Sequence, residues 1–159
     1  MSARVALLGI FAADLTFHAP RLPKLGETVL AEGFTLGAGG KGSNQAIAAA
    51  RAGAEATLIT RVGDDAFADL AFAEWASAGV DTRFVTRAPG EATGAAFIYV
   101  DPTSGQNAIV VNPAAAGALS PEDVRRAHAA IEGAGAFVVQ LEQPLEAAHA
   151  ALALARATL

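Results

Sequence analysis

The sequence contains no cysteine among its 159 residues, and aromatic side chains make up only 6 % of it. The absence of cysteine excludes disulfides, thiolate metal sites and a cysteine nucleophile, and it gives no sign of secretion. Because apolar residues make up 53 % of the chain, small aliphatic side chains, alanine above all, must fill the core. The length is enough for one domain with a real core, or for part of a larger one.

Basic residues and long apolar runs are also scarce. The net charge of −5 and a pI near 5.1 argue against a general nucleic-acid binder or a membrane-surface binder. The apolar run near the N-terminus leads straight into Asp14 and is too short for a signal peptide or a membrane span. The three histidines are too scattered to predict a metal site. We therefore expect a soluble, cytoplasmic protein with neither nucleic acid nor membrane as a partner.

A glycine-rich stretch, Gly37-Ala38-Gly39-Gly40-Lys41-Gly42-Ser43-Asn44-Gln45-Ala46, stands out in this background. Glycine allows backbone angles that a Cβ forbids and lets another molecule approach the main chain closely. An alanine-rich helical run follows, so the glycines precede a helix N-terminus, where free N–H groups favour oxygen-rich ligands. Lys41 adds a positive charge, and the Asn44 amide can donate to and accept from a hydroxyl. The stretch therefore predicts a site for a small polar ligand.

Other interpretations of the glycine stretch stay open. It is not a Walker A motif, because Gly42 follows Lys41 where Ser or Thr is required. It does satisfy G-x-G-x-x-G, the dinucleotide-binding fingerprint, although that pattern normally follows the first, fully apolar strand of its unit. A flexible loop that caps a helix and binds nothing is the third interpretation.

Strands and helices alternate along most of the chain, which predicts an α/β fold with a parallel sheet flanked by helices. Helices are expected from Gly42 to Ala52, from Ala66 to Ala78 with Asp65 as N-cap, and from Leu145 to Leu159. A further helix is expected to run to about Ile131, with Ser120 as its N-cap, Pro121 at its first position and Asp123 completing a capping-box-like pattern. The apolar runs that predict body strands are Val5–Ile10, Ala56–Val62 and Ala136–Leu141. A doubly wound sheet normally has more strands, so the chain looks incomplete.

Two β-rich excursions interrupt this alternation, at about residues 16–36 and 93–111. The second reads as a hairpin around a turn rich in Asp, Pro, Ser and Gly. Together the excursions predict a small sheet beside the α/β body. Asp14 and Glu142 each follow a predicted body strand, and ligands of open α/β sheets bind beyond the carboxyl ends of the strands.

These residues resemble the N-terminal half of the ribokinase-like (PfkB) carbohydrate kinases. The resemblance rests on Asp14, on Arg21-Leu22-Pro23-Lys24-Leu25-Gly26-Glu27-Thr28-Val29, on the run Gly39 to Ala46, and on Val62-Gly63-Asp64-Asp65. It extends from Val5 to at least Glu146, and the Leu-Pro-Lys-x-Gly-Glu-Thr pattern points to the ribokinases within the family. The whole of 1–159 is then the N-terminal part of one kinase domain.

The resemblance implies a sugar site made of Asp14, Gly39, Gly40, Lys41, Asn44 and Glu142. It implies that the β excursions form a lid over the sugar and often a homodimer contact. It further implies transfer of the ATP γ-phosphoryl group to a pentose, most simply ribose, with Mg²⁺ and often a monovalent cation such as K⁺.

The sequence departs from the family at several positions. Ala12 stands where the family usually has Asn, and Ala114 to Gly117 replaces a common Gly-Ala-Asn run, so the exact sugar stays open. The Gly-Ala-Gly-Asp segment that supplies the catalytic base and anion hole is absent, because Gly133-Ala134-Gly135 is followed by Ala136. We therefore assign no catalytic residue. The alternatives are a non-catalytic sugar-binding or dimerising fragment, a kinase for a nucleoside or another sugar, and a dinucleotide-binding enzyme.

Overall fold

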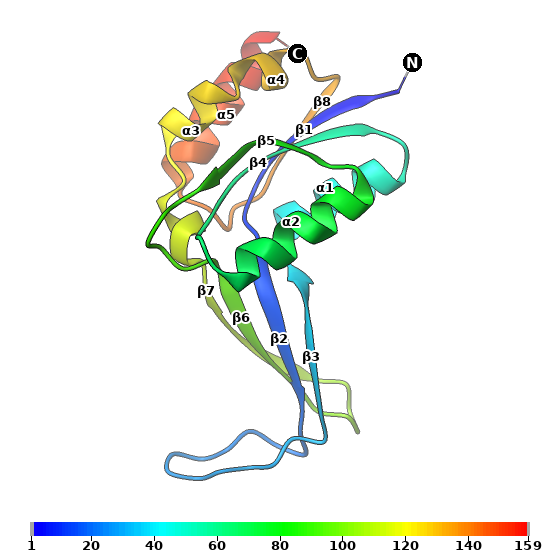
Figure 1. The fold of residues 1–159 in the computed structure, drawn as a ribbon, viewed down its shortest axis with the longest axis vertical. Coiled ribbons are helices and arrows are strands. Elements are labelled where there is room, and N and C mark those ends of the chain that lie inside the picture. The colour runs from blue at the N-terminus through cyan, green and yellow to red at the C-terminus, as the bar shows by residue number, and fades with distance from the viewer. Residues whose placement is uncertain (1, 159) are drawn as a thin grey trace.

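The computed structural model describes residues 2–158, which form two sheets with different surroundings. The body sheet has the strand order β5-β4-β1-β8, and all of its pairings are parallel. The lid sheet has the order β3-β2-β6-β7, with β2 and β6 parallel and the two outer pairings antiparallel. Figure 1 shows the lid sheet projecting from one end of the body.

The elements follow one another in an order that passes twice from body to lid. The strands are β1 (Arg4–Leu8), β2 (Ala12–His18), β3 (Gly33–Gly39), β4 (Glu55–Val62), β5 (Asp81–Arg87), β6 (Ala95–Val100), β7 (Asn107–Asn112) and β8 (Ala136–Val139). The helices are α1 (Lys41–Arg51), α2 (Ala66–Ala78), the short 3-10 helix η1 (Ala114–Ala118), α3 (Pro121–Arg126), α4 (His128–Glu132) and α5 (Leu145–Thr158).

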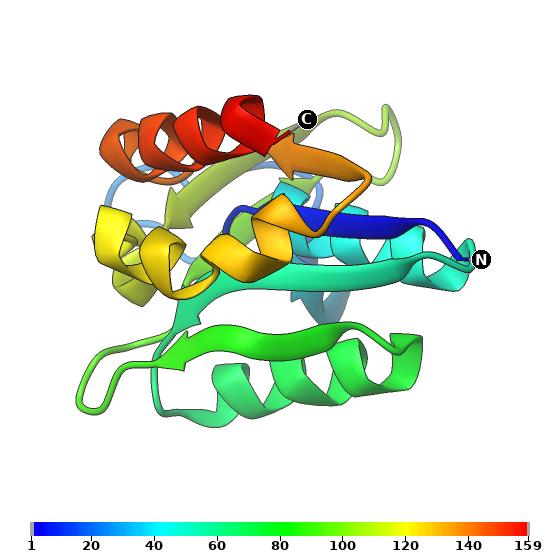
Figure 2. The same ribbon diagram turned by 90° about the horizontal axis from the view of Figure 1, so that it is seen from above.

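Helices cover both faces of the body sheet, as a parallel sheet requires. Alternate residues of β1 and β4 point to opposite faces: Leu7 and Leu58 pack with α1 and α2, whereas Leu8 and Ile59 pack with α3, α4 and α5. Figure 2 shows the sheet between these two helix layers. The α1–α2 layer is completed by Trp75, which is fully buried.

The helix signals of the sequence are confirmed where they are local. Asp65 caps α2 by accepting a hydrogen bond from the Ala68 N–H at 3.0 Å, and Gly79 ends this helix in the left-handed region. Ser120 and Asp123 form the expected capping box at the start of α3. The expected single helix to Ile131 is wrong, however, because the chain turns at Ala127 through tighter i→i−3 bonds and divides it into α3 and α4.

Several predicted boundaries need correction. The first strand ends at Leu8 rather than Ile10, the last body strand ends at Val139 rather than Leu141, and the first helix is shifted by one residue. The lid is wider than predicted: its strands begin at Ala12 and end at Gly39 in the first excursion, with residues 19–32 forming a loop between them. The expected helix end at Leu159 and the expected domain start at residue 1 lie outside the described residues.

The sequence also missed the fourth body strand, β5. Its sequence, Asp-Thr-Arg-Phe-Val-Thr-Arg, has no continuous apolar run, because it lies at the edge of the sheet and pairs with β4 only on one side. Charged side chains are typical of such edges, where they discourage pairing with another chain. The 3-10 helix η1 was not predicted either.

Candidate active site

The glycine stretch lies where the lid sheet meets the body. β3 ends at Gly39, Gly40 adopts a φ of +84°, and α1 begins at Lys41. Gly40 has no side chain to cap the helix, so the first N–H groups of α1 are left for other acceptors. The predicted position of the glycines, immediately before a helix N-terminus, is therefore confirmed.

The same glycines let the loop pack closely on the connection between β1 and β2. A Cβ at Gly42 would lie 2.6 Å from the Cα of Gly9, and a Cβ at Gly40 would overlap with the Ile10 carbonyl oxygen. Next to them, the Ser43 N–H donates to the same Ile10 oxygen at 3.2 Å. Backbone therefore lies directly on backbone here, and neither position has room for a side chain.

Asp14 lies on β2 and faces this loop. Its carboxylate covers Gly39, where an added Cβ would overlap with both carboxylate oxygens. Asp14 is half-buried, and this burial, together with the negative charge of Glu142, raises the pKa of the Asp14 carboxyl above its ordinary value. The effect of Glu142 places the two carboxylates in one electrostatic environment, although they are far apart in the sequence.

Glu142 binds the N-terminus of α1. Its Oε2 accepts from the Lys41 backbone N–H at 3.1 Å, and its Oε1 pairs with the Lys41 ammonium group, across a separation of 101 residues. An anion at this position is stabilised by the free N–H groups and the positive end of the helix dipole. The loop after β8 is thus tied to the glycine stretch.

Asn44 lies one turn into α1, and its backbone N–H donates to the Gly40 carbonyl at 2.9 Å. Among residues 2–158 its exposed side chain has no hydrogen-bond partner, so the carboxamide is free for a ligand. The structure therefore brings Asp14, Gly39, Lys41 and Glu142 together, with Asn44 on the adjoining turn.

The lid contributes a further surface that the sequence did not identify. Side chains alternate along the strands, so Thr16 shares the face of Asp14, and the register places Thr35 and Ile98 beside it. The sequence located these residues in β-rich segments but could not reveal the register. The Lys41–Glu142 contact was missed for a similar reason, since only the folded chain brings the two residues together.

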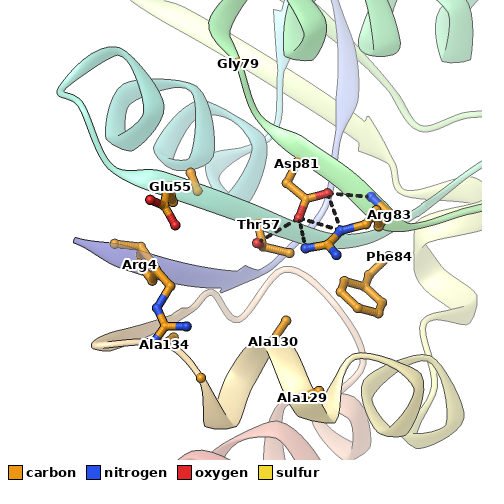
Figure 3. A pocket seen from close by; sticks show the side chains of 13 residues that line it. Arg4, Glu55, Thr57, Gly79, Asp81, Arg83, Phe84, Ala129, Ala130 and Ala134 are labelled. Carbon is orange, nitrogen blue, oxygen red and sulfur yellow. Dashed lines mark hydrogen bonds and ion pairs between the residues drawn. The ribbon is translucent and has the colours of Figure 1, made fainter. Parts of the chain in front are cut away.

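A cavity of about 430 Å³ lies elsewhere, at the opposite end of the body strands. Figure 3 shows its polar side, where Asp81 binds the Arg83 guanidinium and accepts from Thr57, with Phe84 alongside. The helix α4 forms the other wall through Ala129 and Ala130. None of the candidate sugar-site residues lines it, and its ion pair is satisfied internally, so we do not assign it to the site.

Two features were not found among the described residues: a cluster of metal-binding side chains and a membrane-spanning helix. No group of three or more His, Asp or Glu side chains within residues 2–158 is placed to hold a metal ion. Within the same residues, no helix is both long enough and apolar enough to cross a membrane.

Comparisons with known proteins identify relatives of this chain. The chain is 38% identical over 148 residues to a deoxyribokinase of Salmonella typhi, with 93% of the chain and 48% of that protein covered. It is 39% identical to a ribokinase of Staphylococcus aureus, with 99% and 52% covered. The chain thus spans about half the length of the curated relatives it matches.

Solved structures with a similar fold are also matched over about half of their length. The crystal structure of a protein called Sa239 superposes with a TM-score of 0.91 at 38% identity, with 99% of this chain and 52% of that chain covered. A ribokinase of Arabidopsis thaliana complexed with ribose and ATP gives a TM-score of 0.78 at 30% identity, with 97% and 51% covered. The ribokinase-like fold expected from the sequence is confirmed. The family of carbohydrate kinases called pfkB matches residues 2–158, so the chain belongs to the pfkB family of carbohydrate kinases.

Proposed function

We propose that this chain is the sugar-binding part of an ATP-dependent kinase that phosphorylates a pentose, with ribose as the first candidate. The observation that carries the proposal is the Asp14 carboxylate lying over the bare backbone of Gly39 at the start of α1. A carboxylate accepts hydrogen bonds from two neighbouring hydroxyl groups, and a glycine backbone allows a sugar ring to approach closely. The relative that was solved with ribose and ATP belongs to the same fold.

The other residues would complete the sugar contacts. We assign Asn44 to a hydroxyl group, because its amide is free to donate and accept. Glu142, which binds the Lys41 N–H and ammonium group, would orient the sugar from the start of α1. A hydroxyl that donates to Asp14 favours its ionised form, so sugar binding should lower the raised pKa of Asp14.

The chemistry of transfer needs groups that we do not assign within residues 2–158. When bound, ATP supplies the γ-phosphoryl group, and the reaction also needs an anion hole and a base for the hydroxyl proton. Gly133-Ala134-Gly135 leads into β8 instead of opening a helix, so it does not supply them. We propose that this chain binds, orients and covers the sugar, while Mg²⁺, K⁺ and most of the ATP contacts belong to other residues of the whole protein.

The topology indicates where such residues would join the fold. β8 lies at one edge of the body sheet, and the helix α5 that follows it packs on the α3–α4 side. Right-handed crossovers then place a further parallel strand beside the open edge of β8. We therefore propose that residues 2–158 form part of one kinase domain whose sheet extends beyond β8.

2-Deoxyribose is the second candidate substrate. Ala12 is buried and pairs with Gly39 beside the proposed site, and its methyl group makes no hydrogen bond to a hydroxyl. One relative at 38% identity is a deoxyribokinase. ADP release by the full-length gene product, measured with ribose and with 2-deoxyribose, decides between the two sugars. An Ala12→Asn variant should shift the preference towards ribose, and absence of turnover with any pentose or nucleoside would contradict the proposal.

A non-catalytic fragment that binds sugar remains the alternative, because the chain spans about half of its relatives. The intact mass of the protein in its native cells separates the two directly. The dinucleotide-binding alternative lacks its structural context, since Gly37 and Gly39 lie in the antiparallel strand β3 of the lid instead of following a body strand. If the chain did bind a dinucleotide, NAD would raise its unfolding temperature.

We also propose a homodimer formed through the lid. The lid face opposite to Asp14 carries Phe17, Phe34 and Phe97 in ring contact, with centroids 4.9 and 5.7 Å apart. Phe34 is 55% exposed and Val110 on the same face is 68% exposed. An exposed apolar face of this kind fits a second copy of the same face. Val110→Lys should give a monomer in light scattering, whereas Leu152→Lys on α5 should leave the dimer intact.

A cytoplasmic location stays a prediction from composition.

A further inference from the structure

The short segment from Ala92 to Gly94 leads the chain out of the body and into lid strand β6. Thr93 in its middle is only 3% exposed, so its polar groups need partners inside the protein. The Gly63 N–H donates to the Thr93 hydroxyl oxygen at 3.0 Å, and the Thr93 N–H donates to Oδ2 of Asp65 at 2.8 Å. The end of β4 and the start of α2 therefore both hold Thr93.

The two carboxylate oxygens of Asp65 have different partners. Oδ1 caps α2 through the Ala68 N–H, while Oδ2 binds Thr93, so one side chain connects a body helix to the root of the lid. Burial alone would raise the pKa of Asp65, but hydrogen bonds from Thr93 and Ala68 outweigh this effect and hold the pKa below its ordinary value. The carboxylate is thus ionised, and its hydrogen bonds are of the stronger, charge-assisted kind.

The segment also contacts lid strand β2 at the residue before Asp14. The Gly94 carbonyl accepts from the Ala13 N–H at 2.8 Å. A Cβ at Gly94 would lie 2.7 Å from the Phe11 carbonyl oxygen, so the two chains lie backbone to backbone. On the other side, the Ala115 N–H of η1 donates to the Ala92 carbonyl at 3.0 Å.

We propose that Asp65 is a positioning residue that fixes the root of the lid to the body and so holds Asp14 over Gly39. The contacts run from Asp65 to Thr93, then through Gly94 to Ala13, the neighbour of Asp14. Asp65 does not line the proposed sugar site, and its effect on the sugar comes entirely through the placement of Asp14. This inference rests on the proposed function for its effect on sugar binding, but not for its effect on the lid.

An Asp65→Ser variant separates the two roles of the side chain. Serine is a good N-cap whose single oxygen reaches the N–H of Ala68, but it has no second oxygen for Thr93. In the 159-residue chain without ligand, amide exchange followed by NMR should speed up by about tenfold at Thr93 and Ala13, while Ala68 stays protected. Calorimetric titration with D-ribose and with 2-deoxy-D-ribose should show a weaker affinity in the same variant.

Matched variants provide the controls. Asp64→Ser changes the adjacent, exposed carboxylate, which pairs with Arg87, and it should leave both exchange and affinity at wild-type values. Thr93→Ser keeps the hydroxyl that accepts from Gly63, whereas Thr93→Val removes it and should speed up exchange at Gly63. If Asp65→Ser does not fold, Asp65→Asn provides the test, because its amide keeps one oxygen for the Ala68 N–H and has no second acceptor for the Thr93 N–H.

The possible results are distinct. Unchanged exchange at Thr93 and Ala13 in Asp65→Ser would overturn the proposal, and so would faster exchange with an unchanged pentose affinity. Faster exchange with weaker binding supports it. If the wild-type chain binds neither pentose, the proposed function fails, while the exchange data still decide whether Asp65 fixes the lid.

Discussion

The two sheets of this protein differ in how their faces are covered. In the body, residues such as Leu7 and Leu8 are buried on opposite faces between helix layers. In the lid, one face carries Asp14 and the other exposes Phe34 and Val110. The number of strands does not explain the contrast, because each sheet has four strands within residues 2–158. It reflects the helices, which cover both faces of the body sheet but reach the lid only near its root, where Ala13 and Ala38 pack with α1 and α2.

This difference separates stability from recognition. The body buries apolar area on both sides and should provide most of the free energy of folding. The lid has little packing of its own, so its position depends on the few crossings where it joins the body, at Gly39–Gly40 and at Thr93–Gly94. The candidate site lies at these crossings, where lid and body residues come together.

The largest expected difference in stability is between the loss of an aromatic side chain in the body and the loss of one in the lid. Trp75 is fully buried, contacts Phe11 and Phe72 edge to face, and donates its indole N–H to Ser43 at 2.8 Å. We expect Trp75→Ala to lower the free energy of unfolding by about 3–5 kcal/mol. Phe34→Ala in the lid should lower it by less than about 1 kcal/mol. Urea unfolding measures both, and equal losses would refute the division between body and lid.

The next effect tests the crossing from β3 to α1 with one glycine from each element, Gly37 in β3 and Gly42 in α1. Gly42→Ala would place a methyl group against the Cα of Gly9 and should cost about 1–3 kcal/mol of stability. Gly37→Ala is the control, because a Cβ there meets no atom within 4 Å and should change stability by less than about 0.5 kcal/mol. Thermal unfolding of the two variants should show this ranking, and the reverse ranking would show that the start of α1 is not packed on the connection between β1 and β2.

The smallest effect concerns pH. Because the pKa of Asp14 is raised in the folded state, ionisation of Asp14 destabilises the fold as pH rises through and above its ordinary value of 3.8. Asp14→Asn should therefore stabilise the chain at pH 7, by less than about 1 kcal/mol given its partial exposure. At a pH well below 3.8 the carboxyl is protonated in both states, and the difference should vanish.

Asp101, a second lid residue, serves as a control, because its substitution should change stability in the opposite direction. Hydrogen bonds from Ser104 and from the Thr103 N–H hold the pKa of Asp101 below its ordinary value. Asp101→Asn should thus destabilise the chain at pH 7, and the loss should disappear as pH falls and wild-type Asp101 is protonated. Unfolding curves collected from acid to neutral pH would contradict this account if both variants shifted stability in the same direction.

Local features of the fold could be predicted from the sequence, whereas contacts between distant residues could not. Asp65 and Ser120 were assigned correctly as helix caps, because a cap depends on residues three positions away. The strand β5 was missed, because its sequence, unlike that of β8 at the other edge, contains charged residues and no continuous apolar run. The division between α3 and α4 was missed because nothing in Arg126-Ala127-His128 is a helix breaker.

The same distinction between local features and distant contacts applies to the candidate site. Glycine spacing, a following helix and acids beyond strand ends predicted a small-ligand site, and the resemblance to the carbohydrate kinases then selected its six candidate residues. The sequence could not show that Glu142 caps α1 through the Lys41 N–H, because 101 residues separate them. Nor could it show that Asp65, assigned correctly as a cap, uses its second oxygen to hold Thr93. Both contacts form only when segments far apart in the sequence meet in the folded chain.

Calorimetric titration of wild type and Asp14→Ala with D-ribose and 2-deoxy-D-ribose tests the central claim most directly. We expect the wild-type chain to bind at least one of the two pentoses, and Asp14→Ala to lose about 2 kcal/mol of binding free energy, because a charged acceptor of sugar hydroxyls is removed. Equal affinities for wild type and Asp14→Ala, or no binding of either pentose to the wild type, would contradict the assignment of this site to a sugar.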